Sequence, residues 1–309
     1  MRWRPAVSAL ILAFVLGCAI SAHAQDESEN RKRCTDPNAD TKIGGCTAVI
    51  QSGKENSSDL AVAFYNRGNA YDDKEEYDRA IRDYDQAIRF NPSYAQAFNN
   101  RGNDYNRKNQ YDRAIQDYDQ AIKLNPKYAS AFNNRGTIYD EKMGYDRAIQ
   151  DYDQAIRLDP NDADVFMNRG VAYDHKKEYD HGIHDFDQAI KLDPKLASAF
   201  DDRCWARGIL GQLPQALADC NESLRLRPDD SYALGSRGLV YLKMNRFDSA
   251  ILDYDSTLKL APKRASSLYG RGLAERARGN RAKGEADIAA AEKIDPSIAK
   301  EFAGYGLRP

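Results

Sequence analysis

Three histidines lie within ten residues of one another, and clustered imidazoles are the first feature of this sequence that could do chemistry. They are His175, His181 and His184, and a helical register places His181 and His184 on one face. Neutral imidazole nitrogens are common ligands of zinc and related metals. These histidines stand where the chain elsewhere holds arginine or glutamine. We therefore interpret them as surface residues and expect no metal site and no cofactor.

The sequence lacks the motifs of several large enzyme classes. It has no Gly-x-Ser-x-Gly, no His-Glu-x-x-His and no glycine-rich phosphate loop with the required lysine and serine. The chain carries 45 basic and 47 acidic residues, and this near balance is no electrostatic footprint for nucleic acid. We predict that the protein is not an enzyme and does not bind nucleic acid. A metal-dependent activity at the histidine cluster is the alternative from another functional class.

The chain begins with the features of a secretory signal peptide over residues 1–24. Arg2 and Arg4 precede the apolar run Ala6–Ile20, and Ala22-His23-Ala24 forms an A-x-A-like cleavage site. Cleavage after Ala24 predicts a periplasmic or secreted protein. Val15-Leu16-Gly17-Cys18 also resembles a weak lipobox. Acylation of Cys18 would instead tether the protein to a membrane, as a lipid-anchored adaptor in envelope assembly.

A unit of 34 residues recurs without insertion or deletion, and its helices must position every side chain of interest. In the copy from Ala95 to Tyr128, small and aromatic residues recur at helical spacing in each half. This pattern predicts two antiparallel helices with a turn near residues 108–110, and Pro126 ends the second helix. Seven units follow one another over residues 61–298: 61–94, 95–128, 129–162, 163–196, 197–230, 231–264 and 265–298.

The repeated positions resemble the tetratricopeptide repeat (TPR) family. The family pattern W-x2-L-G-x2-Y…A-x3-F…P is present as Phe64, Arg67, Gly68, Tyr71, Ala80, Tyr84 and Pro92. The resemblance implies an all-α, right-handed α-solenoid of helix–turn–helix repeats. In such an array each hairpin buries its apolar face against the next, and capping segments cover the two ends.

Arginine stands where the family usually has leucine, and an aspartate follows it sixteen residues later in every copy. The two positions lie nearly opposite each other in an antiparallel hairpin. We expect each arginine to form a partly buried structural ion pair with an aspartate of its own or the adjoining unit. A row of arginines that binds phosphate or carboxylate groups is the alternative. The pairs that we expect are Arg67–Asp83, Arg101–Asp117, Arg135–Asp151 and Arg169–Asp185.

Four cysteines remain after removal of the signal peptide, and an even number in an exported chain favours disulfides. Cys204 stands in the glycine row of a first helix, and Cys220 replaces the core tyrosine of its partner helix. These two positions face each other, so we expect a disulfide there. Cys34–Cys46 would be the second pair. Four buried free thiols are the alternative, while the spacing of neither pair is typical of a zinc site.

Residues 25–60 form a polar N-terminal segment with a capping helix. Residues 25–33 are charged and have no apolar pattern, so we expect them to be disordered. Ile43–Ser52 is apolar enough to be the capping helix, and Gly53–Ser58 connects it to the first repeat. Residues 299–309 form a C-terminal cap or tail, which repeat arrays need in order to cover their last apolar face.

The resemblance also implies that the first helices line an inner groove, where family members hold extended peptides with asparagines. Asparagine amides offer both a donor and an acceptor to a peptide backbone. The family's clamp for acidic C-termini also needs lysine or arginine, but those places hold Tyr65, Ser130 and Asn134. Asparagines that only keep the groove hydrated are the alternative. The predicted groove residues are Tyr65, Asn66, Asn69, Asn99, Asn100, Asn103, Asn106, Asn133, Asn134, Thr137 and Asn168, with Asp72 and Asp140 beside them.

Together these patterns predict a non-catalytic scaffold or adaptor of the bacterial cell envelope that binds a protein or an extended peptide. Membrane association is expected only if Cys18 is lipidated. No pattern in the sequence specifies an oligomeric state.

Overall fold

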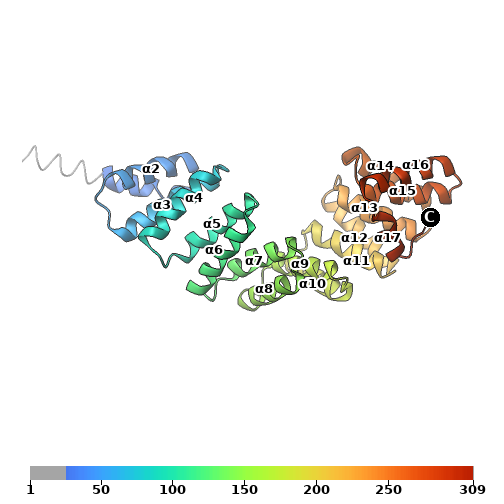
Figure 1. Cartoon of the computed structure of the whole chain (residues 1–309), viewed down its shortest axis with the longest axis horizontal. Helices are drawn as coiled ribbons and strands as arrows, with labels where there is room; N and C mark the ends of the chain where they lie inside the picture. The colour runs from blue at the N-terminus through green and yellow to red at the C-terminus, as the bar shows by residue number, and fades with distance from the viewer. Residues whose placement is uncertain (1–25, 309) are drawn as a thin grey trace, which may run out of the picture. The chain divides into compact units, whose positions relative to one another are not determined.

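The computed structural model describes residues 26–308, and every regular element in that range is a helix (Figure 1). The predicted signal peptide, its cleavage site and Cys18 lie outside the described residues. The described chain divides between Ile138 and Tyr139 into two compact units, which we call the N-terminal unit and the C-terminal unit. No helix in the described range is both long enough and apolar enough to cross a membrane.

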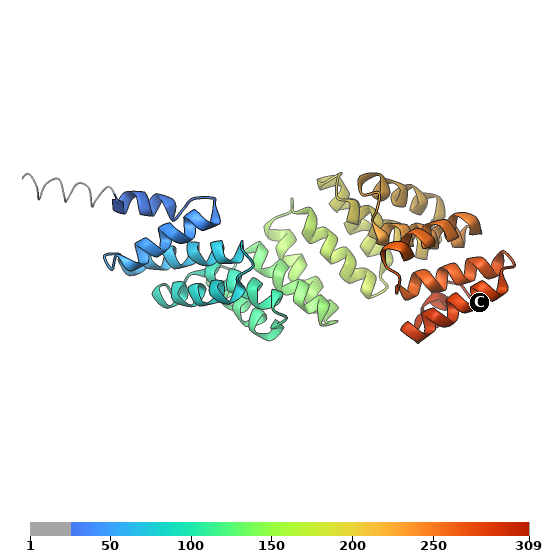
Figure 2. The same ribbon diagram turned by 90° about the horizontal axis from the view of Figure 1, so that it is seen from above.

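Both helices predicted for each of the seven repeats are present, and in six repeats they pack as an antiparallel pair within one unit (Figure 2). The protein is therefore an all-α solenoid. The first helices are α3 (Ser57–Asp72), α5 (Ala95–Arg107), α7 (Ala129–Glu141), α9 (Ala163–His175), α11 (Ala197–Ile209), α13 (Ser231–Lys243) and α15 (Ala265–Ala277). The second helices are α4 (Tyr77–Phe90), α6 (Tyr111–Leu124), α8 (Tyr145–Leu158), α10 (Tyr179–Leu192), α12 (Leu213–Leu226), α14 (Phe247–Leu260) and α16 (Arg281–Ile294).

The turn inside each hairpin uses one residue with a positive φ, and these residues recur every 34 positions. Two of them are Gly211 and Gly279, which adopt the left-handed region without a Cβ clash. The other five turns place a side chain in that region, where L-residues are strained. Those five residues are Glu75, Asn109, Met143, Lys177 and Asn245.

Close contact between the two helices of a hairpin depends on a glycine opposite an aromatic ring. A Cβ added to Gly102 would lie 2.7 Å from Cε1 of Tyr118, whose side chain is fully buried. Cys204 and Cys220 occupy the same two positions in α11 and α12, and they form a disulfide with Cα atoms 5.3 Å apart. The disulfide thus takes the place of the glycine–tyrosine contact in that hairpin.

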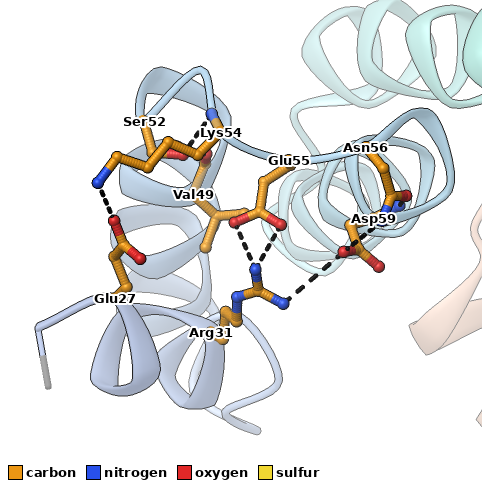
Figure 3. A network of polar contacts seen from close by, with 8 residues as sticks. All are labelled: Glu27, Arg31, Val49, Ser52, Lys54, Glu55, Asn56 and Asp59. Carbon is orange, nitrogen blue, oxygen red and sulfur yellow. Dashed lines mark hydrogen bonds and ion pairs between the residues drawn. The ribbon is translucent and has the colours of Figure 1, made fainter. Parts of the chain in front are cut away.

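The N-terminal segment is ordered, and the expectation of disorder over residues 25–33 is wrong for 26–33, which form a helix. Ion pairs hold this helix to the loop before α3 and to the first turn of α3 (Figure 3): Arg31 contacts Glu55 at 2.7 Å and Asp59 at 3.7 Å, and Lys54 contacts Glu27. These partners are distant in sequence, so the local pattern of charges did not reveal them.

The Cys34–Cys46 disulfide joins the end of this first helix to α2 (Ala39–Gln51). Helix α2 corresponds to the predicted capping helix but begins earlier, because the Asn38 side chain accepts a hydrogen bond from the Thr41 backbone and caps it. Helix α2 packs against α3.

At the other end, α17 (Ile298–Gly304) packs against α15 and α16. Its Ile298 and Phe302 side chains are buried in one cluster with Leu268 and Tyr269 of α15. Helix α17 therefore covers apolar surface of the last hairpin, as a terminal cap must.

Candidate functional site

A network of arginines and aspartates holds the first helices against the second helices. In the N-terminal unit, Arg101 on α5 donates from Nε and Nη2 to the two Asp117 oxygens on α6, at 2.8 and 2.6 Å. The same bidentate contact joins Arg67 to Asp83, Arg169 to Asp185, Arg203 to Asp219, Arg237 to Asp253 and Arg271 to Asp287. The predicted Arg135–Asp151 pair would join residues of different units and stays a prediction.

The remaining guanidinium nitrogen reaches back to the preceding repeat. Nη1 of Arg101 donates to Asp85 of α4 at 2.5 Å, so one arginine ties together three helices. Equivalent contacts join Arg135 to Asp119, Arg169 to Asp153, Arg203 to Asp187 and Arg271 to Asp255, while Arg237 reaches Asn221.

Burial makes this network sensitive to the loss of either partner. Burial raises the pKa of Asp117, and the Arg101 guanidinium opposes that rise. The Arg101 side chain is 18% exposed and that of Asp117 only 7%. Because these guanidinium groups already hold carboxylates, they are not available as a row of anion-binding arginines.

The predicted groove asparagines of the N-terminal unit bond mainly to one another. Oδ1 of Asn69 accepts from the Tyr84 hydroxyl at 2.8 Å and from the Asn100 amide at 2.9 Å. One repeat later, Oδ1 of Asn103 accepts from the Tyr118 hydroxyl at 2.8 Å and from Asn134 at 2.9 Å. This asparagine ladder (Asn69, Asn99, Asn100, Asn103 and Asn134) links consecutive first helices through side-chain amides.

Several predicted groove residues are therefore structural. Asn99 is 4% exposed, donates to Asn100 and accepts from Asn134 at 3.2 Å. The Tyr65 hydroxyl accepts from Asn100 at 3.1 Å, and the Tyr65 ring packs 4.8 Å from that of Tyr94. Sequence spacing could place these residues on the face but could not show that they bond to one another.

Other predicted residues border cavities on the first helices of the N-terminal unit. Asn106 and Thr137 line a cavity of about 250 Å³ beside the ladder, together with Arg107, which was not among the predicted residues. Asn66 lines a second cavity of about 170 Å³, next to Arg31 of the N-terminal segment. The other two members of the predicted set, Asn133 and Asn168, are half-buried on α7 and α9.

Acidic residues beside this face are paired where the next repeat supplies a cation. Asp72 pairs with Arg107, which also contacts Asp104. Burial and the nearby Asp72 carboxylate raise the pKa of Asp104 well above its usual range. In the C-terminal unit Asp140 pairs with His175 at 3.1 Å.

The face changes in the C-terminal unit, where repeats five to seven replace the asparagines. Asn99 and Asn100 correspond to Asp201 and Asp202 in repeat five. In repeat six the same positions hold Gly235 and Ser236, and in repeat seven Tyr269 and Gly270. A cavity of about 370 Å³ lies beside these residues, between α11, α13, α15 and α17.

Trp205, Tyr232, Tyr254, Phe302 and Tyr305 line this C-terminal cavity, and the sequence-based prediction of the groove missed all of them. That prediction rests on the asparagine rows, which end before these repeats. The loss of asparagine at Gly235 and Gly270, together with the tryptophan at position 205, is the signal that could have found the cavity.

The three histidines do not form a common site. His175 contacts Asp140, His181 contacts Glu178 at 3.2 Å, and the exposed His184 contacts Asp185 at 3.6 Å. The hydrogen bond to Asp140 raises the pKa of His175. Over residues 26–308, no group of three or more His, Cys, Asp or Glu side chains has a geometry that could hold a metal ion.

Comparison with family models identifies the repeat. Models described as tetratricopeptide repeat match residues 61–94, 163–196 and 236–297, and a model described as TPR repeat matches 102–142 and 144–174. The chain belongs to the tetratricopeptide repeat family. Proteins of this family are generally non-catalytic scaffolds for protein interactions. None of the curated proteins compared with the chain matches it.

Solved structures of other TPR proteins share the fold. A tetratricopeptide repeat protein from Parabacteroides merdae is 18% identical, with a TM-score of 0.63, over 81% of this chain and 100% of that one. The pilus biogenesis factor PilW is 19% identical, with a TM-score of 0.60, over 67% and 98%. YrrB, described as a TPR protein with an unusual peptide-binding site, is 21% identical, with a TM-score of 0.52, over 61% and 97%.

Proposed function

We propose that this TPR protein is a non-catalytic scaffold of the bacterial cell envelope that holds an extended peptide segment of a partner protein on its first-helix faces. The observation that carries the proposal is the cavity lined by Asn106, Arg107 and Thr137. It lies beside an asparagine ladder that fixes the surrounding first helices. A preorganised polar surface reduces the entropy that a peptide-binding site must lose on association.

The ladder determines which groups are left for a peptide. Asn69 and Asn103 use their carbonyl oxygens within the protein, so they are positioning residues for the face. Asn66 and Asn106 border cavities, and their amides can donate to and accept from a peptide backbone. The solved structure of YrrB, described as a TPR protein with an unusual peptide-binding site, supports the proposal that this fold can bind a peptide.

The proposed compartment is the periplasm or the cell exterior. The two disulfides support it, since such bonds persist in oxidising compartments and are rare in the bacterial cytoplasm. The predicted cleavage after Ala24 agrees with this location. Acylation of Cys18 would keep the same face but add a membrane anchor.

Selection of random peptides displayed on phage against the chain from Gln25 onward tests the peptide-binding face. The test variant is Asn66→Ala with Asn106→Ala, and the control is Gln116→Ala with Gln120→Ala on the exposed face of α6. We expect selected peptides to bind the wild type and the control equally and the test variant at least ~10-fold more weakly. Failure to select any peptide, or equal binding to all three proteins, would overturn the proposal.

A further inference from the structure

The cavity of the C-terminal unit has an aromatic wall built by α11, α17 and the residue that follows α17. The Trp205 ring of α11 packs edge to face against the Tyr305 ring after α17, with centroids 6.0 Å apart. Phe302 of α17 lies 5.7 Å from the Tyr305 ring. Aromatic side chains fixed by one another form rigid, apolar surfaces suited to a flat ring. The cavity measures about 370 Å³, within the range of small-ligand pockets.

Two hydroxyl groups among the lining residues lack a partner. The Tyr254 hydroxyl and Ser267 Oγ make no hydrogen bond to any group over residues 26–308. Both side chains are only 1% exposed. An unpaired buried hydroxyl is costly, and its presence at a cavity wall points to a group outside the chain that completes it.

The equivalent tyrosines of the N-terminal unit show what has been lost. The Tyr84 and Tyr118 hydroxyls donate to Asn69 and Asn103, whereas the residue at that register beside Tyr254 is Leu239, which cannot accept. Ser267 stands where five of the other first helices carry alanine: Ala63, Ala97, Ala131, Ala199 and Ala233. The last repeats have thus removed one acceptor and added one hydroxyl at the same cavity.

The same repeats have also removed the side chains that would fill the space. Gly235 corresponds to Asn99 and Asn133 of earlier repeats. A Cβ added to Gly235 would meet nothing closer than Ser267 Oγ at 3.8 Å, so this glycine leaves room rather than relieving a clash. The cavity is therefore a consequence of local sequence changes in an otherwise constant hairpin.

The cavity rim carries one charge of each sign, so it favours neither a cationic nor an anionic ligand. Arg264 lies over the Tyr232 ring at 4.0 Å and donates to the Ser231 carbonyl at 2.7 Å. Glu301 accepts a hydrogen bond from the Tyr305 hydroxyl at 2.7 Å. A neutral aromatic ligand with one polar group fits this cavity, because its walls are aromatic and its lining holds two unpaired hydroxyls.

We propose that the C-terminal cavity binds a phenol ring, presented as a tyrosine side chain of a peptide held on this face. The ring lies against Trp205 and Phe302, and its hydroxyl meets Tyr254 and Ser267. A phenol oxygen both donates and accepts, so it satisfies two hydroxyls at once, whereas an indole N–H only donates. The peptide source rests on the proposed scaffold function, but the ring specificity can be measured without any partner.

The probes are N-acetyl-tyrosinamide and N-acetyl-phenylalaninamide, which differ by one hydroxyl. Trp205 is the only tryptophan of the chain from Gln25 onward, and it lines the cavity, so its fluorescence reports binding. We expect the tyrosine probe to bind at least ~10-fold more tightly than the phenylalanine probe, since the latter leaves both hydroxyls unpaired. Absent binding, or equal affinity for both probes, would overturn the proposal.

Two variants keep the fold and remove the specificity. Ser267→Ala installs the residue of the earlier repeats, and Tyr254→Phe installs the equivalent of Phe186 in repeat four. Each should lower the ratio of the two affinities, and the two combined should bring it close to one. Gly235→Asn should abolish binding of both probes because its side chain enters the cavity. An unchanged ratio in the first two variants would contradict the assigned roles.

A peptide-selection result and this probe result can fail independently. Tyrosine-specific binding without selected peptides would retain the ring site and reject the scaffold proposal. Selected peptides that bind without any preference between the two probes would retain the scaffold and reject the ring site.

Discussion

The tyrosine that occupies one fixed position of the second helix, as Tyr84, Tyr118 and Tyr254 do, lies in a different environment in each unit. In the N-terminal unit the hydroxyls of Tyr84 and Tyr118 donate to asparagines of a ladder that joins consecutive repeats. In the C-terminal unit Tyr254 has the same buried ring, but Leu239 replaces the acceptor and the residue lines a cavity. The residues at a few first-helix positions therefore determine whether the face is filled by hydrogen-bonded asparagines or contains a cavity.

The framework beneath the two faces is the same. Bidentate arginine–aspartate pairs join the helices of hairpins in both units, for example Arg101–Asp117 and Arg237–Asp253. Because this framework does not depend on the face residues, the face can change between repeats without loss of the hairpin.

Breaking the shared framework should have the largest effect. Asp117→Ala leaves the half-buried Arg101 without its bidentate partner, and we expect the free energy of unfolding to fall by about 3–5 kcal/mol. The measurement is urea denaturation followed by circular dichroism. Asp119→Ala on the same helix is the control; the Asp119 side chain is 48% exposed, and its loss should cost about 1 kcal/mol or less. Equal losses would contradict the framework role.

The hairpin of repeat five tests whether the disulfide replaces the glycine–tyrosine contact. Cys204→Ala with Cys220→Ala should lower the free energy of unfolding by about 3 kcal/mol, because the chain loses a cross-link over this loop. Cys204→Gly with Cys220→Tyr rebuilds the contact of Gly102 with Tyr118 and should recover most of that loss. Thermal denaturation of the two variants compares them directly. A glycine–tyrosine variant as unstable as the alanine variant would show that the positions are not equivalent.

A buried carboxylate of the C-terminal unit, Asp174, makes the free energy of unfolding depend on pH. Asp72 pairs with Arg107 of the next repeat, but the residue at that register for Asp174 is Ile209. Burial, together with the Asp202 carboxylate, raises the pKa of Asp174 to about 8. Above the unfolded value of 3.8 the unfolded chain loses its proton first, so the free energy of unfolding falls as pH rises from 3.8 toward 8.

Asp174→Asn should weaken that dependence, to which Asp104 also contributes, and raise the free energy of unfolding at pH 8 by about 2–3 kcal/mol, with little change at pH 4. Urea denaturation across this pH range is the measurement. Asp180→Asn on the exposed face of α10 should leave the pH profile unchanged. The raised pKa of Asp174 would be contradicted if the free energy of unfolding of the wild type rose between pH 4 and pH 8 and Asp174→Asn lost that rise.

Replacing the second-helix tyrosine by phenylalanine should change the free energy of unfolding differently in the two units. Tyr118→Phe removes the donor to Asn103 and should lower the free energy of unfolding by about 1 kcal/mol. Tyr254→Phe removes an unpaired hydroxyl and should leave stability unchanged or raise it slightly. Parallel chemical denaturation measures both. Equal destabilisation would mean that the two hydroxyls have equivalent partners.

We expect substitutions in the turns of the hairpins to have the smallest effects on stability. Gly211→Ala adds a Cβ at a φ of 79° and should cost about 1 kcal/mol, whereas Glu75→Gly relieves a residue at a φ of 59° and should cost less or stabilise. Differential scanning calorimetry resolves shifts of this size. A glycine variant at position 75 that is less stable than Gly211→Ala would show that the Glu75 side chain contributes more than its backbone strain removes.

The sequence by itself determined the architecture. A constant period of 34 residues, with small residues opposite aromatic rings and a proline after each second helix, permits only stacked helical hairpins. The same period predicted that Cys204 and Cys220 face each other, because register in a helical hairpin follows directly from residue spacing. Boundaries of the hairpins could be read to within a few residues for the same reason.

Only the tertiary structure decided how the polar residues are used. Spacing placed Asn69, Asn99 and Asn103 on one face, but their pairing with each other depends on side chains one repeat away. The helix over residues 26–33 depends on ion pairs to Glu55 and Asp59 that no local pattern encodes. Local substitutions such as Gly235 open the C-terminal cavity, but its lining is completed by Glu301 and Phe302 of α17, and a lining drawn from segments so distant in the chain leaves no periodic signal in the sequence.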